Sequence, residues 1–497
     1  MDKNSIAKTT QQLETKEDLL RLLNQIKQDE MTECGMSDKF YPFTMKLLNY
    51  YCNPNNSFHR YKQFKIKKKS GGFRLITAPR NQSFMLLLRY VNEIFKAVYT
   101  PSDYAMGFIE ERSVVTNADM HKGHNYVFNI DLKDFFPSIH QARVWKRLQL
   151  KPLLFKQPIA NVVAGLCSMK EKMEDGSVRY VLPQGAPTSP IITNMICDNL
   201  DRRLAGLAKR FGVVYSRYAD DITFSSMHNV YHSSGEFIKE LRRIVESQGF
   251  IMNEDKTRLQ KIGTRQEVTG IIVSDKLNVS QKYVRDIRNI LYIWRKYGYA
   301  IAFNKFYPRY KETKGHVKKG NPDMVNVLDG KLMYLKMVKG EDDSVYLRLK
   351  TQFDKLCNSL HDNTRTTQHG ITYVETLPVL EFERKNNTAI TIVTTKPKEF
   401  YTVPQEATEN PQKSISDNFI PHRYASFKLG GRMQKASVNK SLKKEDEDRK
   451  ELLSISNCRD AKGKLFWLVH RSDKVTVPPV QPVDIDELND DLDKLLN

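Results

Sequence analysis

The feature that most constrains this chain is a pair of adjacent aspartates, Asp220 and Asp221, inside an apolar stretch. Residues 215–224 read Tyr-Ser-Arg-Tyr-Ala-Asp-Asp-Ile-Thr-Phe, with aromatic and β-branched residues on both sides of the pair. This pattern predicts a strand, a tight turn with both aspartates at its tip, and a second strand. Adjacent carboxylates repel each other unless a cation lies between them. Such a pair on its own is more often an ordinary polar turn, so its context decides.

A third carboxylate follows an apolar strand further upstream. Residues 127–130 read Val-Phe-Asn-Ile and lead directly into Asp131. If the two strand regions are neighbours in one sheet, Asp131, Asp220 and Asp221 can hold two Mg²⁺ ions about 3.5 to 4 Å apart. Two ions at that spacing activate an attacking hydroxyl and stabilise a leaving phosphate. We therefore expect these three aspartates to be catalytic metal ligands.

The segment between these strands completes a recognisable set. Residues 182–190 read Leu-Pro-Gln-Gly-Ala-Pro-Thr-Ser-Pro. In this order, the Asp131 strand, this segment and the Tyr-Ala-Asp-Asp hairpin resemble the palm motifs of reverse transcriptases. The resemblance implies an α+β right-hand polymerase with fingers, palm and thumb, and it stops near residue 357. It also implies that the backbone carbonyl of Leu132 is a further metal ligand.

A basic hairpin is predicted ahead of the palm motifs. Residues 59–74 are rich in lysine and arginine and contain no acid, and Gly71 and Gly72 mark a turn between two alternating runs. From these residues alone, a solvated basic hairpin is an equal account. The resemblance implies the fingers hairpin that grips the triphosphate of a nucleotide. Arg74 is then the best candidate, because guanidinium binds phosphate bidentately, followed by Lys65 and Lys67.

Three more residues match family positions near the nucleotide. Phe136 stands where the family places a bulky side chain under the sugar, which disfavours a 2′-hydroxyl; ordinary core packing is the alternative. Gln184 resembles the residue that lies against the incoming nucleotide, although its Pro-Gln-Gly context alone is simply a turn. Lys256 is the candidate general acid for the departing pyrophosphate, and a surface lysine is an equal account. Asp134 lies near the expected triphosphate, and helix capping explains it equally well.

Two short motifs narrow the resemblance to bacterial retron and antiphage-defence enzymes. One is Asn117-Ala118-x-x-His121, just ahead of the Asp131 strand. The other is Val-Thr-Gly at 268–270, in a run to residue 273 that we predict to be a strand like the primer grip. His121 alone is more often a core or helix-end histidine, so it stays outside the catalytic set.

Apolar spacing predicts helices at 1–50, 82–99, 141–170, 234–248 and 280–357, and a helix opened by Ser189 and Pro190. The last region carries aromatic and basic side chains and resembles a thumb lying along a template and primer duplex. Its candidate nucleic-acid contacts are Arg285, Arg288, Arg295 and Lys296. For any one of them, a solvated helix face is an equal account. A basic linker is predicted at 311–319.

We predict five regions along the chain. They are an N-terminal helical segment at 1–50, fingers at 51–125, a palm with inserted fingers helices at 126–275, a thumb at 276–357, and an extension of unknown role at 358–497. Within the extension, residues 370–404 alternate in short β-rich runs, residues 428–450 are lysine-rich and predicted to be flexible, and residues 484–493 form an acidic tail.

Composition supports a polyanionic partner but does not identify it. The formal net charge is +21, and such a charge acts on association rather than on fold. The six cysteines are scattered without a Cys-x-x-Cys pair, which argues against a zinc site or a disulfide framework and favours reduced thiols. No apolar run approaches the roughly 18 residues of a membrane span, and the polar amino terminus does not read as a signal peptide. We expect a cytoplasmic protein without membrane contact.

Together these patterns predict an RNA-directed DNA polymerase with two Mg²⁺ ions. Its template would be a noncoding RNA, its substrates deoxynucleoside triphosphates, its product DNA and its role antiviral defence. Template-independent DNA synthesis and maturase-like RNA binding are the alternatives among its relatives. An RNA-binding assembly protein with a vestigial site is the alternative from another class. The route of priming and the oligomeric state stay open, a homo-oligomer included.

Overall fold

The computed structural model describes residues 1–67, 71–172, 176–314 and 323–362, and strands at 372–378, 381–385, 389–393, 424–429, 432–438, 453–459 and 465–471. The chain divides into two compact units, Met1–Asn278 and Val279–Asn497. Each unit has its own internal packing and is described by itself.

The first unit begins with the predicted helices: α1 (Lys3–Gln11), α2 (Lys16–Glu33), α3 (Met45–Cys52) and the short α4 (Ser57–Arg60). Thr15 and Asp18 form a reciprocal capping box at the start of α2, which satisfies backbone donors that a helix end leaves unpaired. The predicted apolar stripe of α2 is buried, and α1 and α2 pack against α5 (Gln82–Val98). These helices share one hydrophobic core with the central sheet.

The predicted basic hairpin is present as β1 (Tyr61–Lys67) and β2 (Phe73–Pro79), paired antiparallel from Tyr61 opposite Pro79 to Lys67 opposite Phe73. Arg60, at its base, is fully buried, whereas Lys62, Lys65 and Arg74 are exposed. Its guanidinium donates to the carbonyls of Tyr51, Gly165 (2.9 Å) and Ser168 (2.7 Å). Arg60 is therefore a structural residue, although in the sequence it is one of the basic residues of this run.

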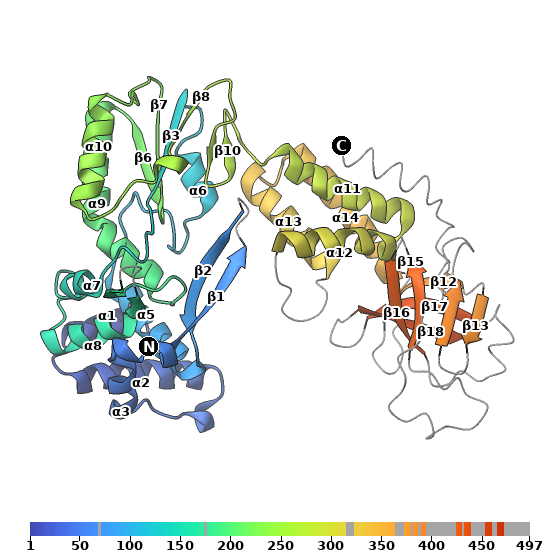
Figure 1. The fold of residues 1–497 in the computed structure, drawn as a ribbon, viewed down its shortest axis with the longest axis horizontal. Coiled ribbons are helices and arrows are strands. Elements are labelled where there is room, and N and C mark those ends of the chain that lie inside the picture. Colours follow the sequence, from blue (N-terminus) through green and yellow to red (C-terminus); the bar gives the residue numbers. More distant parts are fainter. Residues whose placement is uncertain are drawn as a thin grey trace. The chain divides into compact units, whose positions relative to one another are not determined.

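The central sheet has the strand order β6-β7-β3-β8 (Figure 1). Its strands are β3 (Tyr126–Asp131), β6 (Val214–Tyr218), β7 (Asp221–Ser226) and β8 (Arg258–Lys261). The long helix α9 (Ser189–Phe211), with a proline in its first turn as predicted, packs against β6 and against α10 (Glu236–Ser247). The apolar face predicted for residues 234–248 is the buried face of α10.

Two predictions about the rest of this unit are partly wrong. The region predicted to be helical at 141–170 contains two helices, α7 (Gln141–Leu148) and α8 (Gln157–Cys167), but its end belongs to the hairpin of β4 (Met169–Lys172) and β5 (Val178–Val181). Proline near the start of α8 favours a new helix there. The strand predicted at 268–273 is β9 (Glu267–Val268) and β10 (Ile271–Val273), separated by a turn at Thr269 and Gly270, which both have positive φ. With β11 (Leu277–Asn278) they form a small sheet, and α6 (Val114–Asp119) packs against it.

The second unit begins with four helices, as the helical pattern at 280–357 predicted. They are α11 (Gln281–Tyr297), α12 (Tyr299–Lys314), α13 (Met324–Lys339) and α14 (Ser344–Asp362). α11 packs against α12 and α14, and α13 packs against α14. The basic linker predicted at 311–319 is partly wrong, because residues 311–314 end α12; residues 315–319 lie outside the described residues.

The extension forms a mixed sheet with the order β12-β17-β18-β16-β15-β14-β13. Its strands are β12 (Thr372–Pro378), β13 (Glu381–Lys385), β14 (Ala389–Val393), β15 (Tyr424–Leu429), β16 (Arg432–Val438), β17 (Leu453–Arg459) and β18 (Leu465–Arg471). The β-rich runs predicted at 370–404 include β12 to β14. The flexible segment predicted at 428–450 is wrong for the parts within β15 and β16; residues 439–450 and the acidic tail at 484–493 lie outside the described residues.

Two sequence expectations concern cysteines and membranes. The six cysteines are free thiols, and Cys167, Cys197 and Cys458 are buried. In the part of the chain that the structure describes, no helix is both long enough and apolar enough to cross a membrane.

Candidate active site

The three aspartates meet at one end of the central sheet. β3 ends at Asp131, which lies directly opposite Asp221, the first residue of β7. Ala219 and Asp220 form the turn between β6 and β7, and the backbone N–H of Leu132 donates to the carbonyl of Asp220 (3.0 Å). The prediction that both aspartates occupy the tip is therefore wrong for Asp221, which is in the strand. That shift places it beside Asp131.

The carboxylates act on one another electrostatically. Burial, followed by the charges of Asp220 and Asp131, raises the pKa of Asp221 to about 6, although part of this side chain is exposed. Burial and the charge of Asp131 also raise the pKa of Asp220. Asp220 and Asp221 are thus harder to ionise because they are buried and close to other carboxylates. A nearby cation would relieve this repulsion.

Lys256 reaches this cluster from the 3-10 helix Glu254–Lys256. Its ammonium donates to both carboxylate oxygens of Asp131, at 2.9 Å each, and the side chain of Asn253 donates to one of them at 3.2 Å. Burial alone would lower the pKa of Lys256, but the hydrogen bonds to Asp131 and the charges of the aspartates raise it. Lys256 therefore stays an ammonium at neutral pH.

The carboxylate oxygens of this cluster suit a hard divalent cation, but in this conformation they are not arranged to bind one. Within the described residues, no three or more His, Cys, Asp or Glu side chains are grouped to hold a metal ion. In this conformation Lys256 engages both oxygens of Asp131. The residues that would hold the ion are the carboxylates of Asp131, Asp220 and Asp221, and carboxylate oxygens are the ligands that such cations take. They fit the metal in their chemistry.

A buried ion pair supports the turn from behind. Arg217 in β6 and Asp201 in α9 are both fully buried and form two hydrogen bonds of 2.7 Å. The same guanidinium donates to the carbonyl of Ala219 (3.2 Å) and to Asn194, and Tyr215 donates to Asp201 (2.8 Å). Sequence reasoning missed this cluster, although an arginine three residues before the aspartate pair in an apolar strand was a signal.

The two short motifs at 117–121 and 268–270 lie together inside the unit. His121 bridges Ser216 and Ser225, 2.7 Å from each, and so joins β6 to β7. Ser216 donates to Asn117 (2.6 Å), whose amide lies 3.4 Å from the hydroxyl of Thr269. Asn117 and His121 are buried, as predicted for a core histidine. Burial and the neighbouring His124 lower the pKa of His121 to about 3, so its ring is neutral at physiological pH.

The hairpin docks on the Pro-Gln-Gly turn through one face. The N–H of Thr77 donates to the carbonyl of Gln184 (2.8 Å), and a Cβ on Gly185 would lie 2.9 Å from the side chain of Ile76. Arg74 shares the face of Ile76, since strand side chains alternate, and its charge acts on Asp220. Lys65, opposite Leu75, lies on the other face. The side chain of Lys67 lies outside the described residues.

Asp134 and Phe136 follow β3 in an irregular segment. Asp134 is exposed and has a φ of 47°, and the next helix, α7, has His140 at its N-cap position. The helix-capping explanation of Asp134 is therefore wrong. Phe136 is half-buried, with its ring centroid 5.5 Å from that of Phe135 and 6.4 Å from that of Phe108.

Comparison with known proteins shows the family to which this chain belongs. Residues 66–282, which include the three aspartates and Lys256, match the family described as "Reverse transcriptase (RNA-dependent DNA polymerase)". The retron Mx65 reverse transcriptase of Myxococcus xanthus is 37% identical over 255 residues, which are 48% of this chain and 57% of that protein. The retron Ec86 reverse transcriptase of Escherichia coli is 32% identical over 249 residues, 49% of this chain and 72% of that protein. The chain belongs to the retron reverse transcriptases.

This membership confirms the predicted family and the α+β right-hand polymerase fold. The match spans little more than half of the Mx65 reverse transcriptase and 49% of the retron Mx162 reverse transcriptase, also from Myxococcus xanthus. A telomerase structure from Candida albicans aligns with a TM-score of 0.33 at 11% identity, over 61% of this chain and 64% of that one. The division of this reverse transcriptase into fingers, palm and thumb at particular residues stays a prediction.

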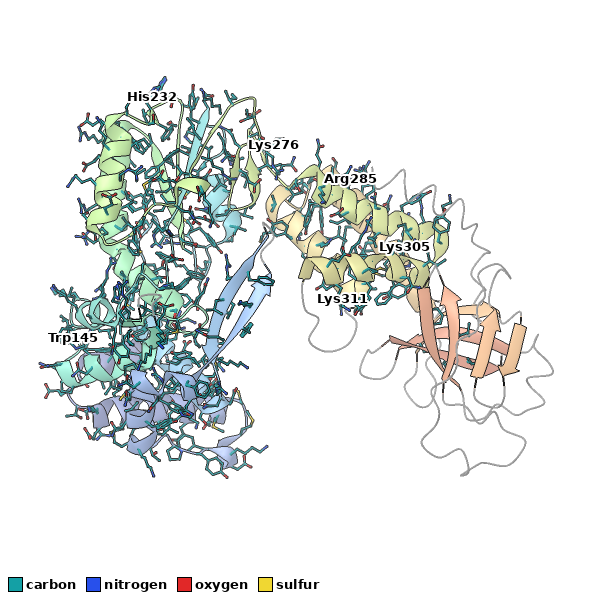
Figure 2. All side chains as sticks on the ribbon, viewed as in Figure 1. Trp145, His232, Lys276, Arg285, Lys305 and Lys311 are labelled. Carbon is teal, nitrogen blue, oxygen red and sulfur yellow. The ribbon has the colours of Figure 1, made fainter. Side chains whose placement is uncertain are left out.

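The basic residues predicted for the thumb lie on α11 of the reverse transcriptase, where Figure 2 labels Arg285. Arg285, Arg288, Arg295 and Lys296 are exposed. The first three follow a spacing of three and seven residues, which places them on one side of the helix. Arg295 and Lys296 lie 5.9 and 5.8 Å from the ring centroid of Tyr292. This side of α11 can contact phosphates, and its role stays a prediction.

Proposed function

We propose that this protein is an RNA-directed DNA polymerase, which joins deoxynucleotides to a growing DNA strand and releases pyrophosphate. The observation that carries the proposal is the pairing of Asp131 with Asp221 across β3 and β7, with Asp220 in the adjoining turn. Burial, followed by the charges of the other aspartates, raises the pKa of Asp220 and of Asp221, which supports a site where a cation offsets these negative charges. The reverse transcriptase relatives support the same chemistry.

The proposed cofactor is Mg²⁺, two ions held by Asp131, Asp220, Asp221 and the backbone carbonyl of Leu132. When bound, such ions lower the pKa of the attacking hydroxyl and neutralise charge on the leaving phosphate. The protein's own part is to bring three acids from two strands to one point. It also has to release Asp131 from Lys256, because the ammonium hydrogen-bonds to both carboxylate oxygens that would bind the metal.

Lys256 then has a second task in this proposal. Its side-chain amine is protonated at neutral pH, since contact with the aspartates raises the pKa of Lys256. When it leaves Asp131, it can donate a proton to the departing pyrophosphate as a general acid. Arg74 lies on the hairpin face that carries Ile76, toward the Gln184 turn, and is proposed to bind the triphosphate with a bidentate guanidinium.

Phe136 and Gln184 complete the proposed nucleotide site. The Phe136 ring lies in the segment that follows the Asp131 strand and is proposed to exclude a 2′-hydroxyl. Gln184 accepts a backbone hydrogen bond from β2, which ties the nucleotide-facing turn to the hairpin. Lys65 is on the opposite face of that hairpin, so we propose a contact with template phosphate for it instead of the triphosphate.

The proposed template is a noncoding RNA, and the proposed role is antiviral defence. The retron-like motifs at 117–121 and 268–270 support this assignment, together with a net charge of +21 that favours binding to a polyanion. The exposed basic side of α11 is the proposed contact with the template and product duplex. No membrane partner enters the proposal.

The test is primer extension by the purified protein with deoxynucleotides, Mg²⁺ and the RNA that copurifies with it. We expect DNA whose sequence complements that RNA. Asp220→Ala and Asp221→Ala should abolish incorporation while the thermal unfolding midpoint is retained. Asp38→Asn is the matched control, because Asp38 is exposed and far in sequence from the three aspartates. This variant should extend the primer normally.

Other results would lead to other functions. DNA with no relation to the RNA indicates template-independent synthesis. RNA binding without any incorporation indicates an assembly protein with a vestigial site, and wild-type incorporation by Asp220→Ala refutes the catalytic assignment.

A further inference from the structure

The segment at 104–108 is fastened to the strand that leads into the catalytic turn. The N–H of Met106 donates to the carbonyl of Arg217 (2.7 Å), and the N–H of Arg217 donates to the carbonyl of Tyr104 (2.8 Å). The amide of Asn194 donates to the carbonyl of Gly107 (3.0 Å). The position of this segment is therefore fixed relative to Asp220.

Gly107 makes the approach closer than any other residue type would. A Cβ at this position would lie 2.8 Å from the backbone nitrogen of Ala219 and 3.3 Å from the ring of Tyr218. Ala219 itself has a φ of 60°. Two backbones that meet so tightly place the next residue, Phe108, at a defined point beside the turn.

Phe108 is unusual in both conformation and exposure. Its φ is 65°, a region that bulky residues rarely adopt, and its side chain is 48% exposed. A strained backbone that ends in an exposed aromatic side chain gains little from burial. Strain of this kind concentrates where a side chain has a task.

The Phe108 ring is placed between two aromatic residues of the site. Its centroid lies 6.4 Å from that of Phe136 and 6.5 Å from that of Tyr218. Phe136 has Phe135 as its other ring neighbour, at 5.5 Å and edge-on. Phe135 is buried and immobilised in the core, so Phe108 is the exposed ring that limits movement of Phe136 on its other side.

We infer that Phe108 is a positioning residue that sets the choice of sugar. By holding the Phe136 ring in one rotamer, it keeps that ring where a 2′-hydroxyl would lie, and so favours deoxynucleoside over ribonucleoside triphosphates. Without it, the Phe136 ring can turn into the vacated space and admit the hydroxyl. The inference rests on the proposed function and adds to it the residue that fixes its substrate class.

The experiment compares kcat/KM for one deoxynucleotide and the matching ribonucleotide, on an RNA template with a DNA primer. Phe108→Gly is the main variant, because glycine adopts a φ of 65° without strain and the fold is retained. We expect its preference for the deoxynucleotide to fall roughly 3- to 10-fold, the worth of one aromatic contact, chiefly through a lower KM for the ribonucleotide. Phe108→Tyr keeps the ring and should keep the wild-type preference.

Phe136→Ala and the double variant test whether the two rings act together. Phe136→Ala should lower the preference by more than Phe108→Gly, and the double variant should equal Phe136→Ala, because Phe108 acts only through Phe136. Tyr41→Ala removes an exposed aromatic side chain elsewhere in the first unit and should change nothing.

Three results would overturn the inference. Phe108→Gly could slow both nucleotides equally, which is the signature of a merely structural role. The losses in the double variant could add, or Phe136→Ala could leave the preference unchanged. A different outcome is that the wild-type protein incorporates no deoxynucleotide on any RNA. That result would refute the proposed function itself, and this inference with it.

Discussion

The ammonium of Lys256 lies 2.9 Å from each carboxylate oxygen of Asp131. A lysine thus sits where the proposed function requires a divalent cation. The two cations cannot both engage the same oxygens, so metal binding and the lysine contact compete.

This competition gives a prediction for Lys256→Met. The variant should reach half-maximal primer extension at a lower Mg²⁺ concentration, because the competing ammonium is gone. Its kcat should nevertheless fall by roughly 10²- to 10⁴-fold if Lys256 is the general acid. A Mg²⁺ titration of extension rates measures both effects, with Lys261→Met, an exposed lysine of β8, as the control. An unchanged kcat would remove Lys256 from the chemistry.

The buried pair Arg217 and Asp201 gives a prediction about stability. Asp201→Asn leaves a guanidinium without its counter-charge in a dry interior, and should lower the free energy of unfolding by roughly 3 to 5 kcal/mol. Urea denaturation followed by fluorescence measures this change. Glu240→Gln, which removes an exposed ion pair with Arg243, should give no measurable change, since surface pairs contribute little.

Removing the whole pair is the informative second experiment. The double variant Arg217→Met, Asp201→Leu leaves no charge at this buried site. Its free energy of unfolding should therefore recover much of the loss seen in Asp201→Asn. Extension by the double variant should remain low, because the carbonyl of Ala219 loses its donor. A double variant as unstable as the single one would show that the charge itself is not the cause.

His121 gives a prediction about pH. Its pKa is about 3 in the folded protein because of burial and the nearby His124, and about 6.5 in an unfolded chain. Below pH 6.5 the unfolded state therefore binds a proton that the folded state refuses. Stability falls as pH decreases, by about 1.4 kcal/mol per pH unit for this one group, until the folded pKa is approached.

The measurement compares wild type with His121→Asn at pH 7 and pH 5. The variant is less stable at pH 7 because the bridge between Ser216 and Ser225 is lost, but its own decline with pH should be smaller by roughly 2 kcal/mol at pH 5. Equal declines in the two proteins would mean that His121 takes up a proton in the folded state.

Gly107 gives a prediction that separates activity from stability. In Gly107→Ala, the new methyl group would lie 2.8 Å from the backbone nitrogen of Ala219, so the catalytic turn has to shift. A displacement of this size at the acids should cost roughly 10- to 100-fold in extension rate. Gly206→Ala is the matched control, because a Cβ there meets nothing within 4 Å and alanine favours the helix α9; it should stabilise the protein and leave its rate unchanged.

Sequence patterns predicted the parts of this fold in which local and tertiary preferences agree. The two hairpins, the capped helices of the N-terminal segment and α9 all begin or end at residues whose backbone preference matches their place. The sequence also predicted that the strands of the three aspartates are neighbours, but the register that pairs Asp131 with Asp221 appeared only with the structure. The prediction for residues 141–170 missed the break between α7 and α8, although proline near the start of α8 marks a new helix, and it ran into β4.

Buried charges were the part that local patterns could not reveal. In the sequence, Arg60 and Arg217 look like the other basic residues of the chain. In the structure, Arg60 donates hydrogen bonds to carbonyls at helix ends, and Arg217 donates to Asp201 on another element. Lys256 and Asp131 are 125 residues apart, and nothing in either neighbourhood indicates their contact. The face of the hairpin on which Arg74 lies depends on the register of its two strands. That Arg74 and Lys65 lie on opposite faces therefore appeared only with the structure.

The attachment of Arg60 bears on how the protein can be shortened. Its acceptors are carbonyls at the ends of α3 and α8, and negative helix ends are what stabilise a buried guanidinium without a carboxylate. A fragment that begins after α3 would still contain every residue proposed to bind metal or nucleotide. It would nevertheless lack one of the groups that neutralise Arg60, so we expect the smallest fragment that folds to include α3.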